Sequence, residues 1–170
     1  MARLPILVAP HPVLKRKAQP VAEVDACVAK LMDDMVETMY DAKGIGLAAP
    51  QVGVLDRVIV IDVHEKDEPA NPIRMANPEI VWSSEEKAIC EEGCLSIPEQ
   101  YAEVTRPKQV RVRYLDEKNQ TQEMEADGLL ATCIQHEIDH LNGVLFVDYL
   151  SMLKRNMLLK KVQKLQKATA

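Results

Sequence analysis

The chain has 170 residues, 47% of them hydrophobic and 28% charged, which suits one globular domain with a real core. Its formal net charge of −5 argues against a nucleic-acid binder, and no apolar run reaches the ~18–20 residues that span a bilayer. The start, Met1 to Pro5, lacks the apolar segment of a signal peptide. We therefore expect a cytoplasmic protein whose four cysteines are buried residues, ligands or reactive thiols rather than disulfides.

The N-terminal third combines an irregular arm, a helix and a glycine-rich segment. Residues 1–23 contain four prolines and predict an extended arm with little regular structure. Apolar residues then recur every three or four positions from about residue 25 to Asp41, which predicts a helix. From Gly44 to Gly53, glycines and small residues exclude a long helix or an ordinary strand and predict a loop. The residues leave open whether this loop is structural or functional. It does not match the dinucleotide-binding fingerprint, because Ala49 stands at the third glycine position.

The middle of the chain predicts small antiparallel sheets. The clearest strand is a short β-branched run, and a polar stretch at 64–71 after it reads as a loop. Residues 116–119 read as a hairpin turn between the last two strands. The predicted strands share β-branched composition or an alternation of polar and apolar residues, and they are 57–63, 73–76, 78–82, 87–90, 102–105, 109–115 and 122–126.

The strongest chemical signal is the stretch that begins at Gln135, in which His136 and His140 stand four residues apart. On a helix these positions share a face, with Cβ atoms about 5–6 Å apart, so both imidazoles can reach one metal ion. Glu137 would lie beside the open face of that ion. An N-cap at Asp127 and an apolar stripe support a helix here. The alternative is a buried helix that contains two histidines by chance.

A last helix is predicted from Ser151 onwards, with six basic residues and no acidic one. Together these patterns predict an α+β fold, with small antiparallel sheets packed around a central metal-binding helix and with an N-terminal and a C-terminal helix. Residues 1–170 are expected to form a single catalytic domain, with 151–170 as its C-terminal helix. The apolar residues expected on one face of that helix are Met152, Leu153, Met157, Leu158, Val162 and Leu165.

A catalytic zinc-type site usually has three protein ligands and one open position. The position where metzincins place a third histidine is Phe146, and no glutamate follows His140, so the third ligand is expected before the helix. His11 and His64 stand in loop-like contexts and read as surface residues. A zinc endopeptidase and a structural metal-binding module are the alternative functions. The first lacks its downstream ligand, and the second usually has four protein ligands.

Among the cysteines, Cys94 is the favoured ligand because it follows a Glu-Glu-Gly turn and its thiolate suits iron, zinc or nickel. Cys90, four residues earlier, is the alternative. Cys27 and Cys133 fall on apolar helix faces and read as buried structural cysteines.

Three stretches, 44–51, 92–96 and 135–140, resemble the three motifs of peptide deformylase in that family's order and spacing. The likeness extends over nearly the whole chain, and the C-terminal helix resembles the bacterial type 1 branch. It implies hydrolytic removal of the formyl group from the N-terminal formylmethionine of newly synthesised polypeptides. It also implies that the basic helix docks on the ribosome near the peptide exit. Membranes and specific nucleic acids are not expected as partners.

The resemblance also implies a set of site residues. The ion would be Fe²⁺, with Zn²⁺, Ni²⁺ or Co²⁺ as substitutes, and its implied ligands are Cys94, His136 and His140. Glu137 is the implied catalytic glutamate, and Gln51 and the backbone N–H of Leu95 are the implied oxyanion donors.

On the substrate side, the glycine loop is implied to be the edge along which the substrate backbone lies. We further hypothesise that Glu92 pairs with Arg106 and steadies the turn at Cys94. Tyr101 departs from the family because an arginine is common there, and Cys90 and Thr132 replace aliphatic pocket walls. The candidate substrate-binding residues are Gly44, Ile45, Gly46, Cys90, Glu92, Gly93, Leu129, Thr132 and Cys133.

Overall fold

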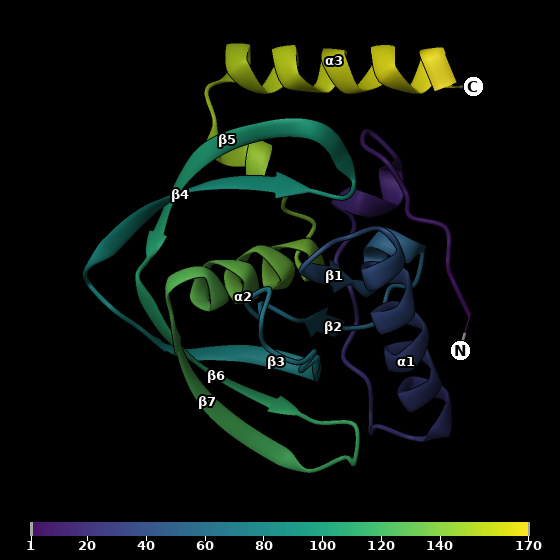
Figure 1. The fold of residues 1–170 in the computed structure, drawn as a ribbon, viewed down its shortest axis with the longest axis vertical. Coiled ribbons are helices and arrows are strands. Elements are labelled where there is room, and N and C mark those ends of the chain that lie inside the picture. Colours follow the sequence, from purple (N-terminus) through teal and green to yellow (C-terminus); the bar gives the residue numbers. More distant parts are fainter. Residues whose placement is uncertain (1, 170) are drawn as a thin grey trace.

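A computed structural model describes residues 2–169, and within this range it contains two antiparallel sheets (Figure 1). The larger sheet has the strand order β1-β2-β3-β6-β7, and β4 and β5 form a separate hairpin. The strand bounds are β1 (Gly46–Ala48), β2 (Val58–Ile61), β3 (Ile73–Ser83), β4 (Lys87–Cys94), β5 (Ile97–Pro107), β6 (Gln109–Leu115) and β7 (Thr121–Asp127).

Helix α2 (Gly128–Leu141) lies at the centre of the fold, between the larger sheet and the β4–β5 hairpin (Figure 1). Its apolar side chains Ile134 and Leu141 are fully buried and belong to the same core as Ile59 and Val112 of the larger sheet. The opposite side of α2 faces the hairpin. This arrangement confirms the predicted α+β class with a central helix.

Helix α1 (Ala26–Asp41) forms where the apolar periodicity predicted it. The Asp25 side chain accepts a hydrogen bond from the Val28 N–H at 2.9 Å and so caps the first turn. Met32, Met35 and Met39 are fully buried and pack with β1 and β2. Flexible methionines fill this core because the chain has few aromatic residues.

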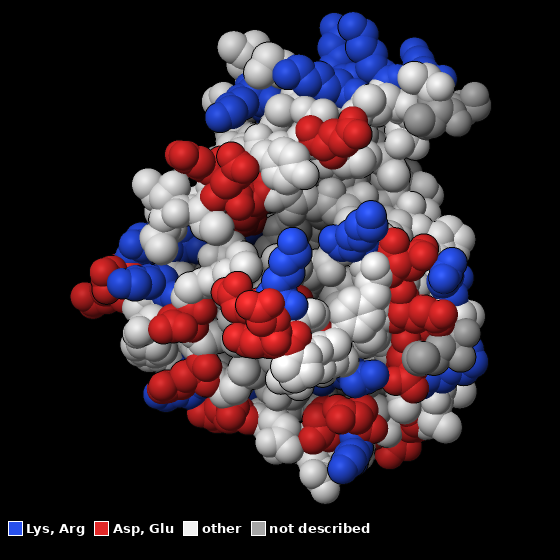
Figure 2. All heavy atoms as spheres, viewed as in Figure 1, with Lys and Arg blue, Asp and Glu red and all other residues white. Residues whose placement is uncertain are grey.

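Helix α3 (Met152–Thr169) ends the described chain, and Figure 2 shows its Lys and Arg side chains gathered along one edge of the molecule. The apolar face predicted for it is wrong in part. Leu158 and Val162 are buried, but Met152 and Leu153, in the first turn, are 76% and 82% exposed. No helix among the described residues is long and apolar enough to cross a membrane.

The base of α3 is fixed by Asp148 in the short 3-10 helix η3 (Phe146–Tyr149). Its carboxylate binds Lys15 at 2.5 Å and Arg155 at 3.0 Å. Lys15 belongs to a second 3-10 helix, η1 (Pro12–Lys15), which interrupts the otherwise irregular N-terminal arm. One acidic side chain therefore joins the arm, η3 and α3. The first and last residues of the predicted arm and tail, 1 and 170, lie outside the described range.

Three local predictions need correction. The segment 44–53, predicted as a loop, contains β1 and the 3-10 helix η2 (Ala49–Val52), because Gly46 to Ala48 pair antiparallel with β2. The predicted strands at 87–90 and 102–105 were too short, since mutual pairing extends the hairpin through Gly93 and Pro98. Cys27, predicted to be buried, is exposed in the first turn of α1.

Candidate active site

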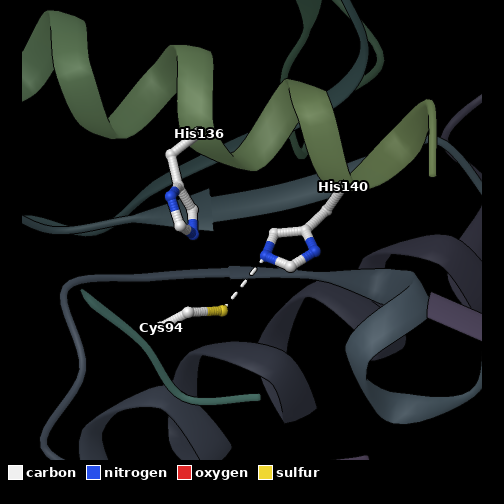
Figure 3. A group of neighbouring side chains, drawn as sticks. All are labelled: Cys94, His136 and His140. Atoms are coloured by element: carbon white, nitrogen blue, oxygen red, sulfur yellow. Dashed lines mark hydrogen bonds between the residues drawn. The ribbon is translucent and has the colours of Figure 1, made fainter. Parts of the chain in front are cut away.

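Three possible metal ligands meet beside α2. The Cys94 Sγ atom and one ring nitrogen each from His136 and His140 all lie within 4.8 Å of one another. Figure 3 shows the sulfur pointing from the end of β4 toward the two imidazoles on α2, with Sγ 3.3 Å from His140 Nε2. Both histidines are buried. A thiolate and two imidazoles form a donor set that suits a divalent transition metal, so these residues fit the expected ion.

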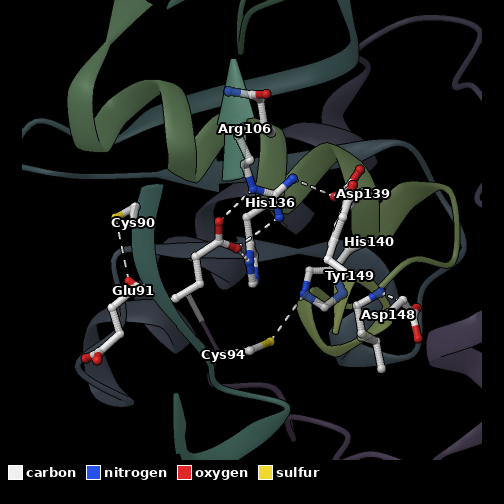
Figure 4. Close-up of polar contacts among 12 residues, drawn as sticks. Cys90, Glu91, Cys94, Arg106, His136, Asp139, His140, Asp148 and Tyr149 are labelled. Carbon is white, nitrogen blue, oxygen red and sulfur yellow. Dashed lines mark hydrogen bonds and ion pairs between the residues drawn. The ribbon is translucent and has the colours of Figure 1, made fainter. Parts of the chain in front are cut away.

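Of the two cysteines left open by the sequence, the structure brings Cys94 to the histidines. Cys90 lies four residues earlier on the same extended strand, which separates the two by roughly 13 Å. Its thiol contacts the Glu91 carbonyl at 3.6 Å (Figure 4). His11 and His64 are both exposed, as predicted for surface residues, and Nδ1 of His64 lies 2.7 Å from Asp62 Oδ1. Neither belongs to the cluster.

His136 is oriented by a buried carboxylate. Its Nδ1 atom lies 3.0 Å from Glu92 Oε1, and Arg106 donates to both oxygens of Glu92 at 2.6 and 2.9 Å (Figure 4). Burial opposes ionisation of Glu92, but the hydrogen bonds from Arg106 and His136 hold its pKa below the ordinary value. An ionised carboxylate only accepts, so Nδ1 of His136 donates and Nε2 keeps its lone pair for an ion. The hypothesised pair of Glu92 and Arg106 is present.

Glu137 is buried beside the ligand cluster, and its Oε1 atom has no hydrogen-bond partner among the described residues. Burial raises the pKa of its carboxyl group to about 7, while the charge of Arg106 acts in the opposite direction. A buried, unsatisfied carboxylate oxygen is costly and therefore marks a place where solvent or substrate binds. A pKa near neutrality suits a group that both accepts and returns a proton.

Gln51 is held at the edge of the cluster by η2. Its Oε1 accepts a hydrogen bond from the Ala48 N–H at 2.9 Å, and its Nε2 donates to Ser96 Oγ at 3.0 Å. The same Nε2 lies 3.6 Å from Cys94 Sγ, so the amide donor is beside the ligands. Leu95 occupies the turn between β4 and β5, next to Cys94.

A cavity of about 400 Å³ opens onto these groups. Cys90 is outside its wall, so its expected role in the pocket is not supported by its position. Ile45 and Leu129 line the cavity at its mouth, where they are 44% and 51% exposed. Sequence reasoning missed Lys43, Glu91, Pro98 and Glu99, which also line the cavity and flank the recognised motifs. The predicted residues that line the cavity are Gly44, Ile45, Gly46, Gln51, Glu92, Gly93, Cys94, Leu95, Leu129, Thr132, Cys133, His136 and Glu137.

The family model described as polypeptide deformylase matches residues 3–156. The chain belongs to the polypeptide deformylase family. A peptide deformylase of Mesorhizobium japonicum is 57% identical over 98% of this chain and 94% of that protein, and one of Phenylobacterium zucineum is 56% identical over 99% of both. The crystal structure of peptide deformylase from Ehrlichia chaffeensis is 41% identical, covers 99% of both chains and has a TM-score of 0.95.

Membership of the deformylase family confirms the predicted enzyme class and reaction, which is metal-dependent hydrolysis of the formyl group on new polypeptides. A second Ehrlichia chaffeensis structure, in complex with actinonin, has a TM-score of 0.93 and 43% identity over 96% of this chain. The alternative of a zinc endopeptidase is not favoured.

Gly46 leaves room for the Glu137 carboxylate. A Cβ atom at Gly46 would lie 2.5 Å from Glu137 Oε2 and 2.8 Å from Cys133 Sγ. We predict that Gly46→Ala lowers kcat for a formyl-Met peptide about 100-fold, since displacing a catalytic group by about 1 Å has this effect. Metal content, measured in parallel, should stay unchanged. The double variant Gly46→Ala, Cys133→Ala removes only the close contact with the sulfur. Recovered activity in this variant would show that Gly46→Ala had displaced the Cys133 sulfur and not Glu137.

Proposed function

We propose that Cys94, His136 and His140 hold a divalent ion, Fe²⁺ in the cell, with Zn²⁺, Ni²⁺ or Co²⁺ as substitutes. The proposal is supported by the mutual distances of the three ligand atoms and by the Glu92 contact that leaves Nε2 of His136 free. When bound, the ion supplies a Lewis acid that lowers the pKa of water and polarises the formyl carbonyl. The observation that carries the proposal is the unpartnered Oε1 of Glu137 beside this cluster.

Glu137 acts as the proton carrier of the reaction. Its carboxylate takes a proton from the attacking water and then passes it to the leaving amine. The Nε2 donor of Gln51 and the N–H of Leu95 hold the oxyanion that develops at the formyl carbon, and each such donor is typically worth ~3–4 kcal/mol. The hydrogen bonds that fix the Gln51 amide to Ala48 and Ser96 keep this donor in place before substrate arrives.

The substrate is an N-formylmethionyl nascent peptide. Its backbone lies along the edge formed by Gly44, Ile45 and Gly46, where β1 has one free side because it is the last strand of its sheet. Its methionine side chain enters the cavity between Ile45, Leu129 and Cys133, with Thr132 alongside. A flexible thioether suits such a mixed wall of aliphatic and sulfur-containing side chains.

We further propose that residues 1–170 act as a single catalytic domain in the cytoplasm.

The role of Glu137 is tested by Glu137→Gln, which keeps the shape of the side chain but removes its basicity. We expect kcat to fall about 10²- to 10⁴-fold with an unchanged metal content. Glu103→Gln is the matched control, because Glu103 is an exposed glutamate on β5 outside the cavity, and its activity should equal that of the wild type. Loss of the metal in Glu137→Gln would show instead that Glu137 holds the site together.

The identity of the ion is tested by loading the chain with Fe²⁺ or Ni²⁺ and exposing both forms to air. Ferrous iron and the Cys94 thiolate can both be oxidised, so the iron form should lose activity much faster. Metal analysis of anaerobically purified protein should find iron as the bound metal. Equal half-lives of the two forms in air would contradict this proposal.

We also propose that α3 docks on the ribosome near the peptide exit, where the substrates emerge. Its six basic side chains are Lys154, Arg155, Lys160, Lys161, Lys164 and Lys167, and α3 contains no acidic residue. The five lysines are exposed, whereas Arg155 is paired with Asp148, and exposed cations bind ribosomal RNA phosphates through an electrostatic term that weakens with salt. The exposed edge in Figure 2 fits such a docking surface.

Charge reversal tests the docking surface. The triple variant Lys160→Glu, Lys161→Glu, Lys164→Glu should lose most of its co-sedimentation with ribosomes at low salt, and its kcat/KM on a short formyl-Met peptide should not change. A charge-matched control reverses Lys66, Lys87 and Lys118, which are exposed elsewhere. Ribosome binding that falls equally in both triples would point to general repulsion and reject a docking role for α3.

A further inference from the structure

We infer that Tyr149 and Asp139 are positioning residues, which hold Arg106 in the orientation that fixes Glu92 and, through it, the metal ligand His136. The inference rests on the proposed metal site. It concerns two side chains that lie outside the cavity and that the sequence motifs do not mark for this role.

Arg106 contacts Asp139 and Tyr149 in addition to Glu92. Its Nη1 atom donates to Asp139 Oδ2 at 2.8 Å, and the Tyr149 hydroxyl donates to the same oxygen at 2.7 Å. The Arg106 guanidinium carbon also lies 4.9 Å from the centroid of the Tyr149 ring. Figure 4 shows these side chains side by side, with Asp139 between Arg106 and the segment that contains Tyr149. The guanidinium is therefore held by two carboxylates and an aromatic face.

Arg106 joins the elements that supply the metal ligands. Arg106 stands on β5 and its partner Glu92 on β4, the strand that ends at Cys94. Asp139 stands on α2, between the ligands His136 and His140. The guanidinium thus ties the hairpin to the helix, and Arg106 and Glu92 are both almost completely buried. Because the planar fork allows only one arrangement of its donors, turning Arg106 toward Asp139 also sets the angle at which it meets Glu92.

Tyr149 is needed to hold Asp139 in place, because Asp139 is more exposed than Glu92, the other carboxylate that binds Arg106. The Asp139 side chain is 20% exposed, against 4% for Glu92, so water competes for its oxygens. The Tyr149 hydroxyl occupies Oδ2, and the Tyr149 ring covers Arg106. Removing the hydroxyl leaves Asp139 free to turn outward, which takes one of the three restraints from the guanidinium.

The test uses the full chain loaded with Co²⁺, and it compares Tyr149→Phe and Asp139→Ala with the wild type. The readouts are the visible absorption spectrum of Co²⁺ and the rate at which a chelator removes it. Tyr149→Phe changes no charge, so its effect reports positioning alone, and we expect release to be about 2- to 10-fold faster. Asp139→Ala should speed release by about 10- to 100-fold. In both variants kcat should fall and KM should stay constant, because neither residue lines the cavity.

Two controls make the test specific. Tyr114→Phe removes the hydroxyl of a half-buried tyrosine on β6, away from the cluster, and should leave the spectrum and the release rate unchanged. In the Asp139→Ala background, Tyr149→Phe should have no further effect, since Tyr149 acts through Asp139.

The outcomes separate this inference from the proposed function. A wild-type chain that binds no Co²⁺ at the three ligands would refute the metal site and the inference with it. A wild-type chain that binds Co²⁺, with unchanged spectra and release rates in Tyr149→Phe and Asp139→Ala, would overturn the inference alone. A lower melting temperature with unchanged Co²⁺ release would likewise overturn it, because it would assign these residues to general stability.

Discussion

The whole site depends on placing ionisable groups on a buried helix. Burying a charge or an unpaired polar group costs several kcal/mol, so each polar side chain of α2 needs a partner in the surrounding elements. Gln135 donates to the Pro107 carbonyl at 3.0 Å, His136 contacts Glu92, and His140 contacts Cys94. Among the described residues, Glu137 Oε1 stays unpaired on this helix, together with Nδ1 of His140. The unpaired carboxylate oxygen lies beside the ligand cluster, where the proposed reaction would use it.

The β4–β5 hairpin provides most of these partners, and its end has an irregular geometry. The register shifts between Gly93 and Cys94, and such a bulge turns the side chain that follows it. A Cβ atom at Gly93 would lie 2.5 Å from the exposed Tyr101 ring, so a side chain there would have to displace this ring. The Tyr101 ring therefore packs on the backbone just before Cys94. Hairpin pairing, bulge and ring together direct the sulfur of Cys94 toward α2.

The sequence predicted those parts of the site that depend on local spacing. His136 and His140 share a helix face whatever surrounds them, so their proximity followed from the helix alone. Cys94 is 46 residues away from His140 in the sequence, so their proximity depends on long-range strand pairing. Residue chemistry favoured Cys94 as the ligand but did not exclude Cys90. Features set by long-range packing were missed for the same reason. Gly46 to Ala48 form the strand β1 only because they pair with β2. Gly93 and Pro98 are unusual in strands, so the local sequence predicted shorter strands than the full β4 and β5.

The 3-10 helix η3 shows how a short segment serves both the fold and the site. Asp148 binds Lys15 and Arg155, whereas its neighbour Tyr149 binds Asp139 and covers Arg106. These adjacent residues fix the start of α3 on one side and the contacts of His136 on the other. Since α3 begins only three residues after Tyr149, its direction relative to the cavity is set by the same contacts. Two adjacent residues of η3 thus serve two separate groups of charges, one at the start of α3 and one beside His136.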